Sequence, residues 1–202
     1  MMQLIVITPE NITEKEGQTI NELFNNGLQT LHLRKPFSSE HEISSLINRI
    51  AEKYHNRIVL HDHFQLVNSF DLKGVHLNRR NHELPQKNLS SISRSCHSFE
   101  CLEASKDFNY VFLSPIFNSI SKSNYNTEFT HEQLTDAKAT GLINETVYAL
   151  SGVTPLTIPY AAEYGFGGVV VLGSLWGNFE IDGNMTALIN RFINLKNICD
   201  KQ

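Results

Sequence analysis

The sequence predicts a single (β/α)8 barrel that occupies residues 1–202 as one domain. Eight apolar runs have the composition of strands, helix-like segments separate most of them, and each run ends in polar or basic residues. Eight strand–helix alternations in about 200 residues are what a small barrel of this class needs. Because such barrels place their active sites at the C-terminal ends of the strands, the polar residues that end the runs are the first candidates for chemistry.

The expected strands are nearly continuous stretches of Val, Ile and Leu, as parallel strands buried on both faces should be. In chain order they are LIVIT (4–8), TLHLRK (30–35), RIVLHD (57–62), GVHLN (74–78), ISRSCH (92–97), YVFLSP (110–115), TVYALSG (146–152) and GVVVLGS (168–174).

Two helices between these runs carry a capping box, in which a hydroxyl residue precedes a Glu or Gln by three positions. These are Ser39 with Glu42 and Thr130 with Gln133. In such a box the two side chains satisfy backbone N–H groups that the first helical turn leaves unpaired. Helices are therefore expected to begin just after residues 39 and 130.

The other helices follow from apolar spacing and from helix-ending residues. Apolar residues at helical spacing predict a first helix around residues 20–24 and a last helix over 185–195. Thr154 followed by Pro155 predicts a helix start after the seventh run. Residues 79–91 show no apolar stripe, so the fourth helix is the weakest expectation.

Charge is distributed unevenly along the chain, whose net charge is −4. That balance does not suggest nucleic acid binding. The basic residues gather at strand ends, however, where only Asp62 and Glu83 oppose them. They are Arg34, Lys35, Arg79, Arg80, Arg94 and Lys122. A locally basic barrel mouth on an acidic chain indicates a small anionic ligand.

Cysteine usage and hydropathy indicate a cytoplasmic protein. Cys96, Cys101 and Cys199 show no paired framework and no C-x-x-C spacing, which fits a reducing compartment. We expect no signal peptide and no membrane span, because the apolar stretch near the N-terminus is only LIVI. The oligomeric state cannot be read from the sequence.

The second run ends in His32-Leu33-Arg34-Lys35. Strand alternation puts His32 and Arg34 on one face, and the neighbouring leucines suit the wall against the helices. We therefore expect His32 and Arg34 to point into the barrel. An inward arginine needs an anionic partner, either a substrate or a carboxylate of the protein.

The third run ends in His61-Asp62-His63. The triplet has the residue types of a transition-metal site. Alternation, however, separates Asp62 from the two histidines, so the three cannot act as one face. Binding of a substrate or of Mg²⁺ is the preferred interpretation.

Three loops have the composition of phosphate-binding segments. SGVTP (151–155) and LGSLW (172–176) follow the last two runs, where barrels commonly bind phosphate. The third, residues 116–129, is long for a βα loop and carries Lys122 between hydroxyl residues, which suits a lid or binding loop. A solvated lysine in a loop without function is the alternative.

Taken in order, these segments resemble the thiamine phosphate synthase/TenI family over essentially the whole chain. The matching pieces are LHLRK, VLHDH, GVHL, RSCHS, YVFLSPIFNSISK, ALSGVTP and GGVVVLGS. The resemblance implies a (β/α)8 barrel acting on small phosphorylated substrates. The synthases join hydroxymethylpyrimidine diphosphate to thiazole phosphate with Mg²⁺ and release pyrophosphate. The TenI branch isomerises a thiazole phosphate carboxylate without such a metal.

The resemblance also implies roles for individual residues. Arg34 and Lys122 would act on the departing diphosphate, and Asp62 would bind Mg²⁺. The family has a second basic residue two positions after the arginine, whereas Lys35 directly follows Arg34 and so stands one position early. The remaining matches would contact substrate: Ser95 lies near the pyrimidine, and the thiazole phosphate is contacted by Ser119, Ser121, Gly152, Leu172 and Gly173.

Some positions depart from the synthase pattern. His32 replaces a glutamine, His61 replaces an asparagine, and Asn81 stands where a second Mg²⁺-binding aspartate is expected. A histidine at position 32 is TenI-like, whereas Pro115 stands where TenI proteins have their histidine. We therefore expect a synthase-like transferase with weak Mg²⁺ binding. A TenI-type tautomerase using His32 or His61 as a base, and a non-catalytic thiamine-phosphate-binding paralogue, remain as alternatives.

Overall fold

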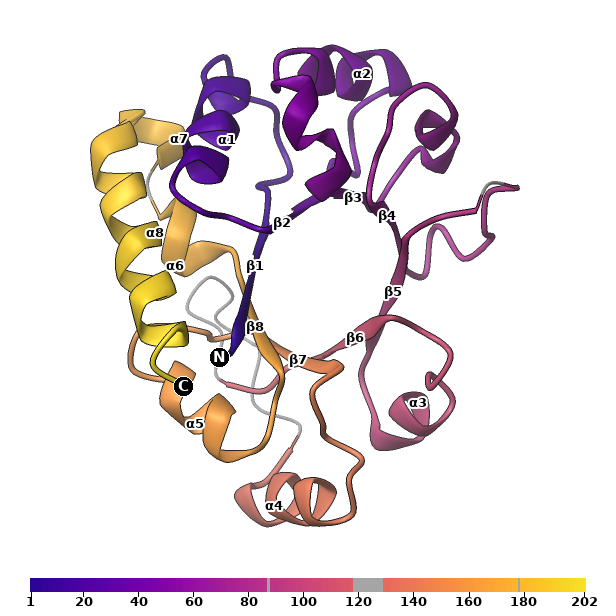
Figure 1. Cartoon of the computed structure of the whole chain (residues 1–202), viewed down its shortest axis with the longest axis vertical. Helices are drawn as coiled ribbons and strands as arrows, with labels where there is room; N and C mark the ends of the chain where they lie inside the picture. The colour runs from indigo at the N-terminus through magenta and orange to yellow at the C-terminus, as the bar shows by residue number, and fades with distance from the viewer. Residues whose placement is uncertain (87, 118–128, 178) are drawn as a thin grey trace.

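Eight parallel strands close into a barrel in which each strand pairs with its sequence neighbours and β8 pairs with β1 (Figure 1). The computed structural model describes all residues except 87, 118–128 and 178. The strands are β1 (Gln3–Ile7), β2 (Thr30–Leu33), β3 (Ile58–Leu60), β4 (Gly74–Leu77), β5 (Ser91–Cys96), β6 (Tyr110–Leu113), β7 (Val147–Leu150) and β8 (Gly168–Val171). The predicted fold class is confirmed, and each expected run overlaps one strand.

Helices surround the barrel everywhere except between β4 and β5, where no helix lies within the described residues (Figure 1). The α-helices are α1 (Glu16–Asn25), α2 (Glu40–Asn48), α3 (Phe99–Glu103), α4 (His131–Ala139), α5 (Ile158–Glu163), α6 (Gly173–Trp176), α7 (Phe179–Asp182) and α8 (Met185–Cys199). Two 3-10 helices, η1 (Glu52–Arg57) and η2 (Phe64–Asn68), flank β3. The connection between β4 and β5 lies largely in the segment, residues 79–91, for which the expectation of a helix was weakest. It is polar and has no apolar stripe that could pack against the barrel.

Both predicted capping boxes form, and α2 and α4 begin directly after Ser39 and Thr130. The expected start at Thr154 is wrong, because α5 begins at Ile158. Thr154 instead closes a turn, in which its backbone N–H donates to Thr157 Oγ1 (2.8 Å).

The main core lies between the barrel wall and the helices, and it includes Leu31 and Leu33 of β2. The barrel interior has two different sides. Apolar side chains from β1, β6 and β8 form one cluster, which contains Ile5, Phe112 and Val170. The opposite side carries buried histidines and serines from β2 to β5.

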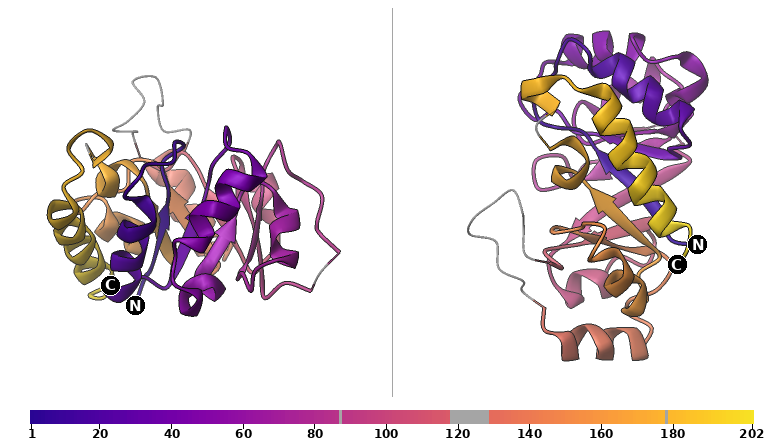
Figure 2. Two further views of the ribbon diagram at one scale, coloured as in Figure 1. Left: turned by 90° about the horizontal axis from the view of Figure 1, so that it is seen from above. Right: turned by 90° about the vertical axis from the view of Figure 1, so that its left-hand side faces the viewer.

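Both chain termini lie at the N-terminal end of the barrel, opposite the face on which the strands end (Figure 2). Met2 N donates to Cys199 O (3.3 Å), which ties the last helix to the start of β1. Among the described helices, none is long and apolar enough to cross a membrane.

Candidate functional site

A pocket of about 330 Å³ opens at the C-terminal ends of the strands. Its walls come from both sides of the ring, with Arg34 and Arg80 after β2 and β4, and Gly152 and Gly173 after β7 and β8. The floor is formed partly by His61 and Phe112. The pocket is where the fold class predicts chemistry, and we call it the mouth pocket.

Arg34 reaches this pocket as strand alternation predicts, but it has an acidic partner in the protein. Its Nη1 donates to Glu10 Oε1 at 2.6 Å, and both side chains are partly exposed and line the pocket. Glu10 lies in the loop after β1. It is an acidic residue at the mouth in addition to Asp62 and Glu83, which were the two expected there. A pair this exposed contributes little to stability, so an incoming anion can replace the carboxylate.

Asp62 and Asn81 do come together, as the implied magnesium site requires, but donors already occupy the carboxylate. Asp62 Oδ1 accepts from Arg80 Nη2 (3.0 Å) and Asn81 Nδ2 (3.1 Å). Asp62 Oδ2 accepts from the backbone N–H of Lys35 (3.2 Å). Mg²⁺ prefers carboxylates supplemented by substrate phosphates. With one carboxylate, held by a guanidinium and an amide, these residues do not fit a resident magnesium ion.

Lys35 does not line the mouth pocket. Its side chain is wholly buried, and Nζ donates to Pro9 O (2.7 Å), Asn11 O (2.8 Å) and Glu16 Oε2 (2.9 Å). Glu16 is buried as well, and desolvation raises the pKa of its carboxyl although Lys35 opposes the rise. The structure therefore places Lys35 in a buried ion pair that holds the β1–α1 loop, away from the expected diphosphate position.

A hydrogen-bonded chain runs from the mouth pocket down the barrel axis. His61 lines the pocket, and its Nε2 lies 2.8 Å from His32 Nδ1. His32 Nε2 lies 2.6 Å from the Tyr110 hydroxyl, deeper in the barrel. His32 thus points inward as predicted, but it contacts substrate space only through His61. His63 turns away, because its left-handed backbone (φ 53°) directs Nε2 to Ser38 O (2.9 Å).

His76 forms a second polar connection beside this chain. Its Nδ1 contacts Ser93 Oγ (2.8 Å) and its Nε2 contacts Ser95 Oγ (2.9 Å), and Ser95 lines the mouth pocket. The His76 ring stacks on His61, with centroids 4.3 Å apart and an interplanar angle of 17°. Ser95 therefore lies where the family resemblance expects it, held by a buried histidine.

The ring nitrogens of His32, His61 and His76 gather within 4.8 Å of one another, a spacing that suits a metal ion. Their orientation does not suit one. Both nitrogens of His32 and both of His76 already have hydrogen-bond partners. The stacked rings of His61 and His76 also direct their in-plane lone pairs side by side rather than toward one point. The cluster is a hydrogen-bonded network.

Burial sets the protonation state of these histidines. It lowers the pKa of His32 and of His61 well below the usual range, and the neighbouring His76 lowers both further. Burial lowers the pKa of His76 to about 3. All three rings are neutral at pH 7, so each has one donor and one acceptor nitrogen. His61 can therefore form a hydrogen bond as a neutral ring with a ligand in the mouth pocket.

The loops after β7 and β8 present small residues to the pocket. Gly152, Leu172 and Gly173 all line it, as the resemblance implies, together with Ser174. Ser174 Oγ is buried and has no hydrogen-bond partner in the described structure. An orphaned buried hydroxyl is costly unless a ligand completes it. The first N–H groups of α6 also lack partners inside the helix, so this corner is suited to a phosphate.

Two contacts fix the position of α6. Trp176 Nε1 donates to Ile7 O (2.8 Å) at the end of β1. Arg191 Nε, from α8, donates to Leu175 O (2.7 Å). The phosphate-binding corner therefore rests on both the barrel and the last helix.

Three predicted site residues lie outside the described part of the chain, namely Ser119, Ser121 and Lys122. Conversely, sequence reasoning missed Glu10, His76, Tyr110 and Ser174. His76 and Tyr110 could have been found, since each alternates with apolar wall residues in its strand as His32 does. Ser174 directly follows a predicted residue, Gly173. Nothing in the sequence signalled Glu10.

Comparisons with known proteins identify the family and the fold. The family model for thiamine monophosphate synthase matches residues 4–175. A crystal structure of thiamine phosphate pyrophosphorylase from Bacteroides thetaiotaomicron has 39% sequence identity and a TM-score of 0.91, covering 100% of this chain and 99% of that one. No curated protein matches the chain.

More distant structures share the fold alone. A thiamine phosphate pyrophosphorylase from Pyrococcus furiosus has 18% identity and a TM-score of 0.75, covering 99% of this chain and 96% of that one. A tryptophan synthase alpha chain from Legionella pneumophila has 14% identity and a TM-score of 0.64, covering 99% and 92%. Since the family model spans most of the chain and the Bacteroides structure matches its full length, the chain belongs to the thiamine monophosphate synthase family.

Proposed function

We propose that this protein is a thiamine-phosphate synthase that joins hydroxymethylpyrimidine diphosphate to thiazole phosphate in the cytoplasm. The observation that carries the proposal is the presence of two separate anion-binding corners in one pocket. Arg34 and Arg80 provide positive charge after β2 and β4, and Ser174 with Gly173 provides an uncharged corner after β8. A reaction between two phosphorylated substrates needs two such corners.

The reaction breaks the bond between the pyrimidine methylene carbon and the diphosphate oxygen. The thiazole ring nitrogen forms the new bond to that carbon, and pyrophosphate leaves with the electron pair. Charge therefore develops on the leaving diphosphate, and cations placed beforehand stabilise it most effectively. In this proposal Arg34 and Arg80 bind the diphosphate, while Gly152, Leu172, Gly173 and Ser174 bind the thiazole phosphate.

The remaining site residues have positioning roles in this proposal. Ser95, held by His76, and His61, held by His32, contact the pyrimidine. Ser119, Ser121 and Lys122 complete the phosphate contacts, as the family resemblance implies. Asp62 orients Arg80 through their ion pair. Since Asp62 and Asn81 do not fit a resident magnesium ion, any Mg²⁺ requirement comes from the ion that accompanies the diphosphate.

One observation favours a second candidate function. His61 lines the pocket as a neutral ring, and its hydrogen bond to His32, which in turn bonds to the Tyr110 hydroxyl, gives it a path for a proton. A thiazole tautomerase of the TenI type needs such a base. Its substrate carries one phosphate and one carboxylate, whereas two arginines in one corner suit a diphosphate, which is why the synthase is preferred.

The test is pyrophosphate release from the two synthase substrates, measured with and without added Mg²⁺. Release that depends on both substrates supports the synthase. Isomerisation of the thiazole phosphate carboxylate without pyrophosphate release would replace it by the tautomerase. Tight binding of thiamine phosphate with neither reaction would identify a non-catalytic paralogue.

A further inference from the structure

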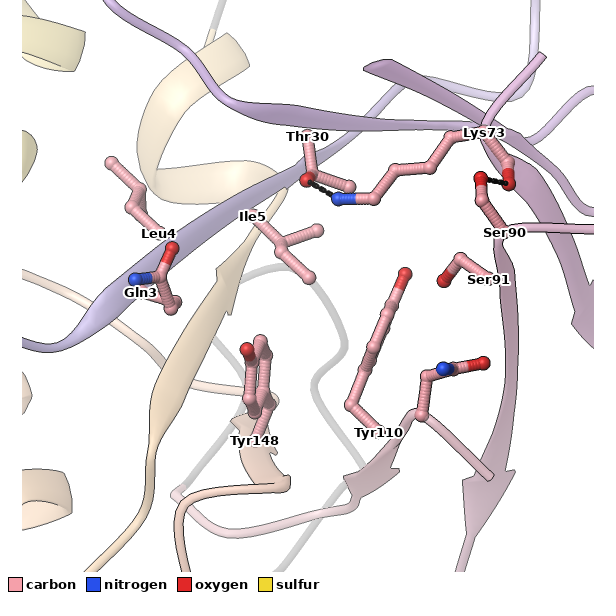
Figure 3. Close-up of a pocket in the computed structure, with 10 residues that line it drawn as sticks. Gln3, Leu4, Ile5, Thr30, Lys73, Ser90, Ser91, Tyr110 and Tyr148 are labelled. Carbon is pink, nitrogen blue, oxygen red and sulfur yellow. Dashed lines mark hydrogen bonds between the residues drawn. The ribbon is translucent and has the colours of Figure 1, made fainter. Parts of the chain in front are cut away.

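A second cavity, of about 220 Å³, lies at the opposite end of the barrel from the mouth pocket (Figure 3). It is formed where β1, β2, β4, β5, β6 and β7 begin, near both chain termini. This end of a (β/α)8 barrel usually serves stability rather than ligand binding. Most of the lining residues are nonetheless polar, and Thr30, Lys73, Ser91 and Tyr110 lie around the same space in the close-up. We call this cavity the lower pocket.

Lys73 is the only charged residue among those that line the lower pocket. Its side chain extends across the cavity, and Nζ donates to Thr30 Oγ1 at 2.6 Å (Figure 3). Among the described residues it has no carboxylate partner. Partial burial lowers the pKa of its ammonium group. A partly desolvated cation without a counter-ion favours an anionic ligand.

Other side chains that can donate hydrogen bonds line the same pocket as this ammonium group. Ser91 is 2% exposed, and its Oγ makes no hydrogen bond of normal geometry in the described structure, although the Tyr110 hydroxyl lies beside it. Asn109 accepts from Ile92 N (2.7 Å) with its carbonyl oxygen, which leaves its amide protons for another group. A buried hydroxyl without a partner is costly. The pocket therefore offers hydrogen-bond donors to a ligand whose oxygens can accept them.

The remaining wall is built from two stacked tyrosines. The rings of Tyr110 and Tyr148 lie 5.2 Å apart at an interplanar angle of 19°. Tyr148 occupies its place because residue 168 is glycine, since a Cβ there would lie 2.8 Å from the Tyr148 ring. Rigid aromatic walls keep the donors at fixed positions, so the cavity is not an accidental gap between loops.

We propose that the lower pocket is a second ligand site, which binds a small oxyanion such as phosphate or a short carboxylate. Lys73 pairs with the negative charge, and the hydroxyls of Ser91 and Thr30 donate to the oxygens. The cavity is smaller than the roughly 300 Å³ at which pockets for drug-sized ligands begin, so the ligand has few atoms beyond the oxyanion. This site shares no lining residue with the mouth pocket.

The test is an NMR titration of the ¹⁵N-labelled full chain with inorganic phosphate in one arm and acetate in the other. Sodium chloride at matched ionic strength is the control. We expect saturable shifts of the amide signals of Lys73, Ser91 and Tyr110 in at least one arm. Phosphate bound in the mouth pocket is recognised separately, by the signals of Gly152 and Gly173.

Lys73→Met should abolish the shifts at the lower pocket and leave those at the mouth unchanged. Lys73→Arg, which keeps the charge, should retain them, and Lys106→Met removes a charge from an exposed position as the control. Two results would overturn the proposal. One is the absence of saturable shifts at the lower pocket of the wild-type protein in both arms, a result that needs no variant. The other is unchanged binding in a folded Lys73→Met protein.

Discussion

At the scale of single residues, the mouth pocket contains two arginines, each of which forms an ion pair with a carboxylate of the protein. Arg34 pairs with Glu10, and Arg80 pairs with Asp62. Partly exposed ion pairs contribute about 0–1 kcal/mol to stability, whereas an arginine binds a phosphate group through two parallel hydrogen bonds. Both side chains are thus held in place before the ligand arrives. Arg34 can transfer to the ligand at little cost, whereas Arg80 keeps the buried Asp62 as a partner and binds the ligand with its other N–H groups.

Arg34→Ala should lower kcat/KM for pyrophosphate release about a hundredfold or more, the usual effect of removing one preplaced donor from a developing anion. The melting temperature should change little, because Arg34 is partly exposed and loses only the Glu10 pair. Arg79→Ala, an exposed arginine outside the pocket, is the matched control. Equal losses of activity in the two variants would show that activity depends on the total positive charge of the protein and not on the position of Arg34.

Asn81→Asp should reduce the Mg²⁺ concentration required for half-maximal pyrophosphate release. The substitution places a second carboxylate beside Asp62, where Asn81 now donates an N–H, and Mg²⁺ binds carboxylates better than amides. It also competes with Asp62 for Arg80. The control is Asn48→Asp, at an exposed position of α2. Asn78 is not used for this purpose because it lines the pocket. An unchanged Mg²⁺ requirement would place residue 81 away from the metal.

The direction of a side chain could be predicted where strand alternation determines it. It could not be predicted where contacts with residues distant in the sequence determine it. His32 points inward because Leu31 and Leu33 take the wall positions in a pattern that the sequence itself displays. Lys35, the next basic residue, is buried because Glu16 and two loop carbonyls surround it. Those groups come from a segment about twenty residues earlier, and no local pattern reports their approach.

At the scale of elements, the corner after β8 combines a short helix with two anchors near the C-terminal end of that helix. Trp176 binds the end of β1, and Arg191 from α8 binds the carbonyls of α6. The glycine-containing loops were predictable from composition, and so were the two capping boxes. The start of α5 was not, because Thr154 and Thr157 are both good capping residues and the choice depends on how the loop packs.

Ser174→Ala should weaken binding of the phosphorylated thiazole about tenfold, since a hydrogen bond to a charged group contributes roughly 1.5–3 kcal/mol. The same substitution should leave the free energy of unfolding unchanged or raise it, because it removes a buried hydroxyl that has no partner. KM and urea denaturation measure the two effects. Ser45→Ala, at an exposed position of α2, is the control. A marked loss of stability would mean that Ser174 has a structural partner.

At the scale of the whole molecule, the barrel interior is apolar on one side and polar on the other. His32, His61 and His76 are buried there, and within the described residues none of their hydrogen-bond partners is a carboxylate. The polar side connects the two ends of the barrel, because Tyr110 lines the lower pocket and His61 lines the mouth pocket. The eight-stranded frame was predictable from the sequence, whereas this division follows from which side chains meet inside the closed ring.

This interior should make the protein lose stability as the pH falls. The unfolded chain binds a proton on each histidine near pH 6.5, whereas burial keeps His76 unprotonated down to about pH 3. Unfolding therefore takes up protons below pH 6.5, and the free energy of unfolding decreases as pH decreases. From pH 7 to pH 5, each such histidine should remove about 2 kcal/mol.

His76→Gln tests this account, because glutamine can still bond to Ser93 and Ser95 but cannot be protonated. The variant should lose about 2 kcal/mol less than the wild type between pH 7 and pH 5, measured by urea denaturation at both values. His41→Gln, at an exposed position, should follow the wild type. If His76→Gln shows the same pH dependence as the wild type, His76 is already protonated in the folded protein, and the neutral network inside the barrel does not exist in the form described.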